Sequence, residues 1–322
     1  MELPPLVCIV GPTATGKTAL AVRLSEAVGG EIVSADSRQV YRGMDIGTAK
    51  ATPEEQARVV HHLIDVVEPN ETLGLAQFQE LAYAAIADIT SRGRVPFLVG
   101  GTGQYIMAVI EGWKMPRVPP DEVLRAELYR QADEEGSEAL HARLQDLDPA
   151  AAERIDARNV RRVVRALEVC LITGRPISVQ QTKSPPPYRV LILGLRLSRQ
   201  QLYRRIDQRV EAMITAGLED EVRRLVAAGY GFGLPAMSGV GYGQFAPYLA
   251  DVGDPAEVVT LDRVIREIKR ATRRFVRHQS NWFRQEGIHI HWLDASDDPY
   301  GTALNLVRHF LASSTPTGSV VE

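Results

Sequence analysis

The chain has 322 residues, of which 45% are hydrophobic and 24% are charged, a balance typical of a globular protein. No apolar run is long enough to span a bilayer and no secretory signal is recognisable, so we expect a cytoplasmic protein outside the membrane. Two cysteines, Cys8 and Cys170, are too few for a disulfide framework or a Cys-based zinc site, and we expect both in the core.

The net charge of −3 argues only weakly against an anionic partner, because the charge is unevenly distributed. Residues 121–153 hold ten acids and three arginines, whereas residues 262–284 hold eight cations and two acids. The second segment predicts a local contact with an anion.

In chain order, short apolar runs first alternate with segments of helical period. The predicted elements are a strand at 6–10, a helix at 17–28, a strand at 31–36, a strand at 61–67, a helix at 76–90 and a strand at 94–101. Alternation of this kind predicts a parallel sheet covered by helices.

Two proline-rich stretches, 114–121 and 183–188, bracket a region of helical periodicity. We interpret 116–187 as a helical insertion into a discontinuous core of residues 1–115 and 188–312. The core resumes with a strand at 189–197, helices at 199–216 and 218–228, a glycine-rich loop at 229–243, a long helix at 256–285, a strand at 288–293 and a helix at 299–312. The tail, 313–322, is expected to be disordered.

The segment GPTATGKT, residues 11–18, follows the first predicted strand and opens the first helix. It matches the phosphate-loop pattern G-x-x-x-x-G-K-[ST] in full, and in this context a chance glycine turn is the weaker interpretation. Backbone amides, the helix N-terminus and Lys17 can hold a diphosphate, while Thr18 can bind Mg²⁺. The predicted diphosphate-binding residues here are Gly11, Thr13, Ala14, Thr15, Gly16, Lys17 and Thr18. The predicted fold class is therefore α/β, a P-loop NTPase-like parallel sheet core with helices on both faces, plus an all-helical insertion.

The loop alone does not identify the diphosphate. The strand at 94–101 ends in Gly100-Gly101 without the metal-binding Asp expected of a nucleoside-triphosphate hydrolase. Asp36 ends the second strand, beside the loop in a conventionally wound sheet, and can act as a general base, bind Mg²⁺ or simply cap a helix. A small-molecule kinase with Asp36 at its acceptor therefore remains an alternative.

Eight motifs carry a resemblance to a known family. They are GPTATGKT, SADSRQVYRGMDIGTAK (34–50), HHLIDVVEP (61–69), VGGTGQYI (99–106), RNVRRVVRALEV (158–169), GLRLSRQQLYRRIDQRVEAMITAGLEDEV (194–222), VGYGQ (240–244) and ATRRFVRHQSNWFR (271–284). In this order and spacing the chain resembles the tRNA dimethylallyltransferase (tRNA isopentenyltransferase) family over nearly its whole length apart from the tail. The run from Asp36 to Lys50 is far more specific than the phosphate loop.

The resemblance implies transfer of a dimethylallyl group from dimethylallyl diphosphate to N6 of the adenine 3′-adjacent to the anticodon in tRNA, with Mg²⁺ as cofactor. Asp36 matches the catalytic aspartate. Thr102, the second predicted catalytic residue, matches a position that contacts the tRNA near the reacting base, although it can also cap a helix. An arginine of the 194–222 segment binds diphosphate in the family, which makes Arg205 and Arg209 candidates; solvated surface arginines are the alternative.

Reaching N6 requires the adenine to leave the anticodon loop and enter a pocket, so the enzyme must grip the surrounding anticodon stem-loop. The resemblance implies tRNA contacts at Asp36, Ser37, Arg38, Gln39, Thr102, Arg125, Arg161, Arg162, Arg165, Val240, Gly241 and Tyr242. The sequence SGVGYGQ (238–244) departs from the family by lacking the polar or basic residues that usually flank Val-Gly-Tyr. We expect weaker RNA affinity or compensation elsewhere, and a monomeric enzyme.

Two arginine-rich helix faces extend the expected RNA contact. One holds Arg158, Arg161, Arg162 and Arg165, and the other holds Arg263, Arg266, Arg270, Arg273, Arg274 and Arg277. Leu261, Val264, Ile265, Ile268 and Phe275 form the apolar face of the second helix. A solvated face with intrahelical ion pairs is the alternative, but Asp262 and Glu267 are too few to pair all these arginines.

Overall fold

The computed structural model describes residues 3–116, 118–184, 188–250, 259–283 and 289–313. The chain divides into two compact units, one of residues 1–110 and 187–322 and the other of residues 111–186. The predicted boundary at 116 thus falls inside the second unit. The predicted disordered tail lies almost entirely outside the described residues.

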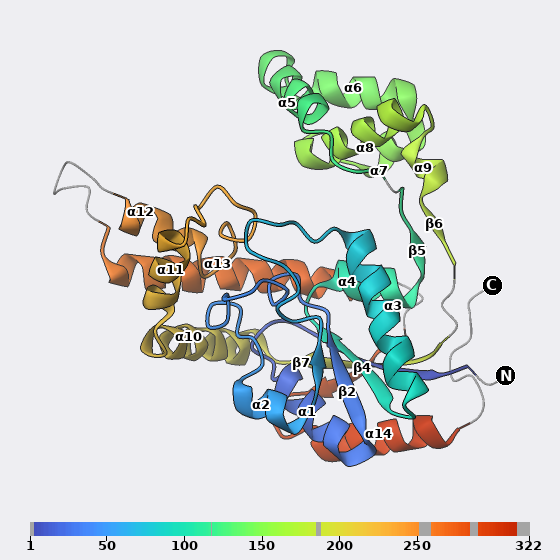
Figure 1. Ribbon diagram of the computed structural model, residues 1–322, viewed down its shortest axis with the longest axis vertical. Helices are drawn as coiled ribbons and strands as arrows, with labels where there is room; N and C mark the ends of the chain where they lie inside the picture. Colours follow the sequence, from blue (N-terminus) through green and yellow to red (C-terminus); the bar gives the residue numbers. More distant parts are fainter. Residues whose placement is uncertain (1–2, 117, 185–187, 251–258, 284–288, 314–322) are drawn as a thin grey trace. The chain divides into compact units, whose positions relative to one another are not determined.

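Six strands of the first unit form one parallel sheet in the order β3-β2-β4-β1-β7-β8 (Figure 1). They are β1 (Pro5–Val10), β2 (Gly30–Ser34), β3 (His61–His62), β4 (Val95–Gly100), β7 (Arg189–Arg196) and β8 (His291–Asp294). In the centre, Val7 of β1 is in register with Phe97 of β4 and Leu191 of β7. β1 is apolar throughout because a parallel sheet is buried on both faces.

Helices cover both faces of this sheet (Figure 1). They are α1 (Lys17–Val28) and α14 (Tyr300–Ala312) on one face, and α3 (Leu75–Ser91) and α4 (Gly103–Ile110) on the other. Along β1, Val7 and Ile9 pack on the first face while Cys8 packs on the second, as the period of a strand requires. The predicted α/β class, with its parallel sheet and helices on both faces, is confirmed.

A further layer of helices packs around the loops that follow β2. Its elements are α10 (Arg199–Thr215), α11 (Leu218–Ala227), α13 (Leu261–Trp282) and the short η1 (Gly243–Phe245) and α12 (Ala246–Leu249). Two ion pairs, Arg273–Asp207 at 2.5 Å and Lys269–Glu211 at 2.6 Å, show that α10 and α13 run antiparallel. Another short helix of this unit, α2 (Pro53–Arg58), begins after the capping residue Thr52.

The second unit consists of helices around an apolar core of its own. They are α5 (Glu122–Glu135), α6 (Ser137–Leu147), α7 (Pro149–Arg154), α8 (Val160–Thr173) and α9 (Ile177–Gln180). The expected all-helical insertion also contains a short antiparallel pair, β5 (Trp113–Lys114) with β6 (Thr182–Lys183). Cys170 is 5% exposed in this core and Cys8 is fully buried in the sheet, as predicted.

The strand predicted at 61–67 is wrong beyond His62. Leu63 and Asp65 have φ values of 62° and 54°, in the left-handed region, which ends the extended backbone. The long helix begins at Leu261, where the Thr260 side chain accepts a hydrogen bond from the Arg263 amide, and the expected start at 256 lies outside the described residues. Over the described ranges, none of the helices combines the length and apolarity needed to cross a bilayer.

Candidate active site

The phosphate loop joins the carboxyl end of β1 to α1. Gly11 has a φ of 139°, and a Cβ there would lie 2.5 Å from the carbonyl oxygen of Leu195, so only glycine fits beside β7. The Thr15 hydroxyl and the Lys17 ammonium both donate to the carbonyl oxygen of Pro12, at 2.9 and 2.8 Å. The other predicted members, Thr13, Ala14, Gly16 and Thr18, lie in the same loop and the first turn of α1. The loop is thus a compact turn at a helix N-terminus, suited to an anion.

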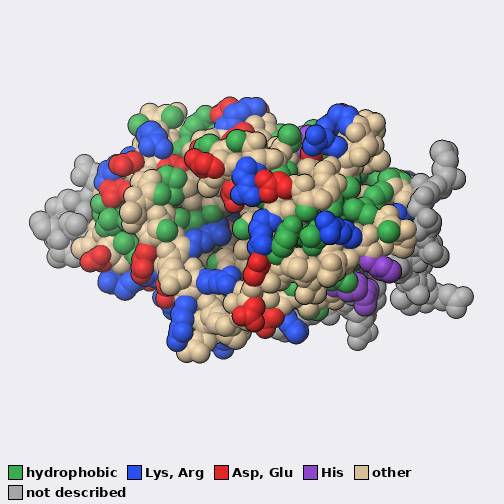
Figure 2. Space-filling model, turned by 90° about the horizontal axis from the view of Figure 1, so that it is seen from below, with side chains coloured by type: hydrophobic (Ala, Val, Ile, Leu, Met, Phe, Trp, Pro, Cys, Tyr) green, Lys and Arg blue, Asp and Glu red, His purple; other side chains and the backbone are tan. Residues whose placement is uncertain are grey.

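Three charged groups interact beside this loop. Burial lowers the pKa of Lys17 to about 8, the neighbouring Arg209 lowers it as well, and Asp36 acts in the opposite direction. Burial also lowers the pKa of Arg209, against the attraction of Asp36. A bound anion would reduce the repulsion between these two cations and favour the charged form of each. In the face drawn in Figure 2, Lys and Arg side chains gather in and around a hollow near the middle of the view.

Asp36 and Thr102 lie at the carboxyl ends of neighbouring strands, β2 and β4. The backbone amide of Arg38 donates to Asp36 Oδ1 at 2.9 Å, which fixes the carboxylate in a tight turn. The backbone amide of Ser37 donates to the Thr102 hydroxyl oxygen at 3.1 Å. The structure therefore brings the two predicted catalytic residues together, because Thr102 is hydrogen-bonded to Ser37, the residue that follows Asp36.

Arg38 and Gln39 have internal partners. The Arg38 guanidinium donates to the carbonyl oxygen of Pro235 at 2.6 Å, and the Gln39 amide donates to the carbonyl oxygen of Ala49 at 3.0 Å. Both side chains hold loops together, so the predicted tRNA contacts at these positions would have to be made by their remaining polar atoms.

A cavity of about 220 Å³ opens beside these groups. It is lined by the charged side chains of Lys17, Asp36 and Arg209. It is also lined by the apolar side chains of Ile206, Val210 and Met213 of α10 and of Ile268 and Phe275 of α13. Such a cavity suits a ligand with one anionic and one apolar end.

The predicted tRNA-binding loop at 240–242 divides between the cavity and the core. Val240 and Gly241 line the cavity. Tyr242 is 1% exposed, and its hydroxyl donates to Glu221 Oε1 at 2.7 Å. Its side chain is therefore a core group in this structure, and the contact of this position with tRNA stays a prediction. Burial and the neighbouring Glu221 carboxylate both raise the pKa of Tyr242, which stays protonated.

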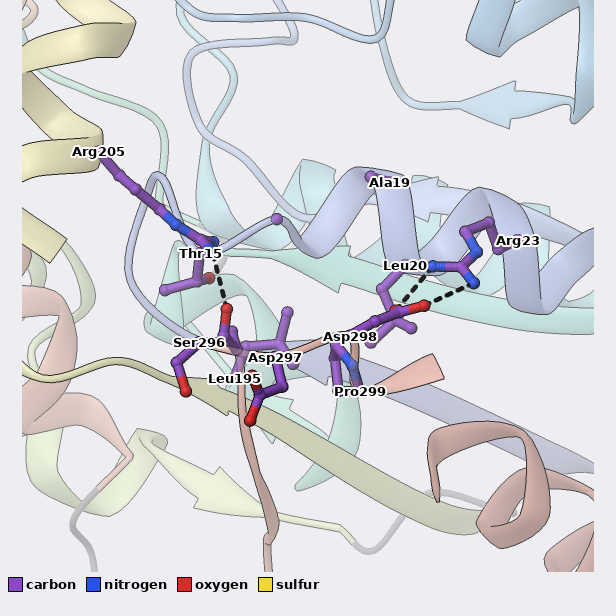
Figure 3. A pocket seen from close by; sticks show the side chains of 12 residues that line it. Thr15, Ala19, Leu20, Arg23, Leu195, Arg205, Ser296, Asp297, Asp298 and Pro299 are labelled. Atoms are coloured by element: carbon purple, nitrogen blue, oxygen red, sulfur yellow. Dashed lines mark hydrogen bonds and ion pairs between the residues drawn. The ribbon is translucent and has the colours of Figure 1, made fainter. Parts of the chain in front are cut away.

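The two arginines predicted to bind diphosphate face different cavities. Arg205 lines a second cavity of about 310 Å³ beside Thr15 and α1, while Arg209 lines the first. Figure 3 shows Arg205 extending from α10 toward Thr15, and its guanidinium donates to the carbonyl oxygen of Ala295 at 2.7 Å. In the same view Arg23 pairs with Asp298 at 2.7 Å. Both arginines lie on one helix, and each cavity is also lined by residues of the phosphate loop, so diphosphate binding by either arginine stays a prediction.

In the second unit, the predicted RNA-binding arginines differ in their surroundings. Glu168 is fully buried and pairs with both Arg125, at 2.8 Å, and Arg165. Arg161 and Arg162 are exposed on α8. Arg125 and Arg165 thus neutralise a buried carboxylate. Within the described part of the chain, the guanidinium groups of Arg161 and Arg162 have no ion-pair partner and are accessible to an external one.

The basic face of α13 is only partly as predicted. Arg263, Arg266, Arg270, Arg274 and Arg277 are exposed. Arg273 instead pairs with Asp207 of α10, an acid on another element that the helix pattern could not reveal. Phe275, placed on the apolar face by its spacing, is 44% exposed at the first cavity.

Two buried polar residues escaped the sequence analysis. Glu221 accepts hydrogen bonds from the backbone amides of Asp45, Ile46 and Gly47, at 3.0, 2.8 and 3.1 Å. Gln279 of α13 contacts the phosphate loop. A Glu or Gln in a polar helix carries no local signal of burial, so neither role could be predicted.

Comparisons with known proteins agree with the geometry. The IPP transferase family model matches residues 39–286, and the isopentenyl transferase model matches residues 4–66. The curated tRNA dimethylallyltransferase of Roseiflexus sp. (strain RS-1) is 58% identical over 281 residues, 87% of this chain and 90% of the relative.

Solved structures extend the likeness. The crystal structure of the full-length tRNA isopentenylpyrophosphate transferase from Bacillus halodurans is 41% identical, with 96% of each chain covered and a TM-score of 0.68. A eukaryotic dimethylallyltransferase acting on tRNA has the same fold, with a TM-score of 0.80 over 98% of this chain and 81% of that one, at 24% identity. These matches do not favour the small-molecule kinase alternative. The chain belongs to the IPP transferase family of tRNA dimethylallyltransferases.

Proposed function

We propose that this chain transfers a dimethylallyl group from dimethylallyl diphosphate to N6 of the adenine 3′-adjacent to the anticodon in tRNA. The observation that carries the proposal is the cavity at the phosphate loop, which is lined both by charged side chains, among them Lys17, Arg209 and Asp36, and by apolar side chains of α10 and α13. A prenyl diphosphate has matching polar and apolar ends.

The phosphate loop would hold the leaving group. As the bond between C1 of the allyl group and the diphosphate oxygen breaks, negative charge grows on that oxygen. Lys17, Arg209 and the loop amides would stabilise this charge, because the two cations lie at the cavity and the amides belong to the phosphate loop.

We propose Mg²⁺ as the cofactor, with the Thr18 hydroxyl as its protein ligand. The described residues contain no group of three or more His, Cys, Asp or Glu side chains that could hold a metal. Mg²⁺ in proteins is commonly bound through one or two carboxylates together with waters and substrate phosphates, so the donor's diphosphate would supply further ligands. When bound, Mg²⁺ would neutralise part of the diphosphate charge.

Asp36 would act as the general base. The adenine N6 forms the new bond to C1 while the C1–O bond breaks, and one N6 proton passes to the Asp36 carboxylate. The Arg38 amide occupies one acceptor position of Oδ1, and the carboxylate has others that can receive N6–H. Thr102 orients this turn through the Ser37 amide.

The apolar residues that line the cavity would receive the dimethylallyl group. Ile206, Val210 and Ile268 are at most 2% exposed, and Phe275 forms the outer edge. Packing of the prenyl group here would also exclude water, which could otherwise take the group in place of N6.

We propose the tRNA anticodon stem-loop as the partner, gripped by Arg161 and Arg162 and by the exposed arginines of α13. Recognition of a single-stranded loop with an extruded base uses backbone cations in this way. One chain supplies every group named above, so we propose that a monomer is active, in the cytoplasm where free tRNA is available.

Replacing Asp36 by Asn tests the proposed base. Asn keeps an oxygen that can accept the Arg38 amide but cannot take a proton at neutral pH. We expect kcat to fall by about 100-fold or more, with little change in the affinity for donor or RNA. Asp133→Asn, at an exposed position on α5, is the matched control. Unchanged turnover in Asp36→Asn would remove Asp36 as the base.

A further inference from the structure

Gln279 is a buried polar side chain on the basic helix α13. It is 5% exposed, and both ends of its amide are hydrogen-bonded to backbone. The Thr13 amide donates to Oε1 at 2.9 Å, and Nε2 donates to the carbonyl oxygen of Gly101 at 3.1 Å. Burying an amide is costly unless it is paired in this way, so the side chain is specified by these two contacts.

The two partners belong to different loops of the site. Thr13 lies in the phosphate loop after β1, and Gly101 follows β4 directly. A Cβ at Gly101 would lie 2.4 Å from Gln279 Nε2, so the glycine makes room for the bridge.

The bridge continues to the proposed base. Thr102 is the residue after Gly101, and its hydroxyl oxygen accepts the amide of Ser37, the residue after Asp36. The Gln279 side chain therefore connects the phosphate loop with the loop after β4, and Thr102 of that second loop contacts the loop that carries the proposed base.

We propose that Gln279 is a positioning residue that sets the spacing between the phosphate loop and Asp36. This inference rests on the proposed function for its effect on transfer. Reaction requires C1 of the donor, fixed through its diphosphate, to lie within reach of the N6 that Asp36 holds. A misplacement of about 1 Å can cost about 100-fold in rate.

Gln279→Met tests the role, because Met has a similar length and can fill the space without making either hydrogen bond. We expect kcat to fall by about 10- to 100-fold, the donor KM to rise, and the RNA KM to stay within about twofold, since Gln279 faces away from the exposed arginines. Ser280→Ala, which removes only a hydrogen bond to Val276 within the same helix, is the control with unchanged kinetics.

A double-mutant cycle separates positioning from packing. Gly101→Ala alone should reproduce the loss of kcat, because its Cβ displaces Nε2. In a Gln279→Ala background the space is free, so adding Gly101→Ala should cost no further activity. Fully additive losses in kcat would contradict a shared role.

The affinity for inorganic diphosphate, measured by calorimetry, gives a readout that does not depend on transfer. We expect Gln279→Met to bind diphosphate about tenfold more weakly, because the Thr13 end of the loop is released. Unchanged kcat and diphosphate affinity, with only a lower melting temperature, would overturn the proposal and leave Gln279 a packing residue. A wild-type chain that binds diphosphate but transfers no prenyl group would defeat the proposed function, while the diphosphate comparison would still decide the role of Gln279.

Discussion

At the scale of single residues, Lys17 shows how the fold tunes a charge for the proposed donor. Its ammonium lies close to the cation Arg209, and burial together with this neighbour lowers its pKa to about 8. The group is therefore charged at neutral pH but close to losing its proton. A bound diphosphate would favour the charged form and raise the pKa again.

Donor binding should accordingly weaken in mild alkali. Below pH 8 the free enzyme has Lys17 charged and ready for the donor; above pH 8 the neutral form dominates, and binding must first take up a proton. We expect the KM for dimethylallyl diphosphate to be flat from about pH 7 to 8 and then to rise by up to about tenfold per pH unit. The RNA KM serves as the internal control. A donor KM that stays constant to pH 9.5 would contradict a lowered Lys17 pKa.

At the scale of elements, α11 holds two loops of the site in place through one carboxylate. Glu221 is 1% exposed and accepts three consecutive loop amides and the Tyr242 hydroxyl. Gly47 and Gly241, which line the first cavity, lie at either end of this arrangement. Charged acceptors of several hydrogen bonds stabilise strongly, and their removal leaves the donors unpaired.

Glu221→Ala should therefore destabilise the first unit by about 3 kcal/mol or more, from three amides left without an acceptor. Asp220→Ala, at an exposed position in the same first turn of α11, is the control and should cost about 0.5 kcal/mol. Urea unfolding midpoints of the two variants provide the comparison. Equal midpoints would show that the buried carboxylate does not hold the loops.

The same scale shows how far the sequence could predict the structure. Strand and helix periods and the phosphate-loop motif depend on local sequence, so the sheet, its covering helices and the closeness of Asp36 to the loop followed from them. The predicted strand does not continue beyond His62, because positive φ values at non-glycine residues leave no recognisable pattern in the sequence. The internal partners of Arg273 and Tyr242 could not be predicted, because these partners, Asp207 and Glu221, lie on other helices.

At the scale of the whole molecule, a net charge of −3 coexists with a basic face on one helix. The exposed arginines of α13 are separated from most acids, although Glu267 lies 3.7 Å from Arg270. A polyanion can therefore bind this basic face although the net charge of the protein is negative.

Binding to an anticodon stem-loop should weaken steeply as salt rises, with log Kd linear in log salt concentration. Arg266→Ala should reduce the slope by about one. Arg308→Ala, exposed on α14, is the control with an unchanged slope. Fluorescence anisotropy between 50 and 300 mM salt (about a sixfold range, enough to resolve one unit of slope) makes the test. A flat response in the wild type would contradict RNA contact by this face.

The central claim is that the phosphate loop holds a prenyl donor whose group moves to RNA. The most direct measurement incubates the protein with Mg²⁺, an unmodified anticodon stem-loop with adenine after the anticodon, and labelled dimethylallyl diphosphate. A parallel reaction contains labelled ATP instead. We predict label in the RNA from the prenyl donor alone, absent when that adenine is replaced by guanine. Phosphate transfer from ATP without any prenyl transfer would contradict the account.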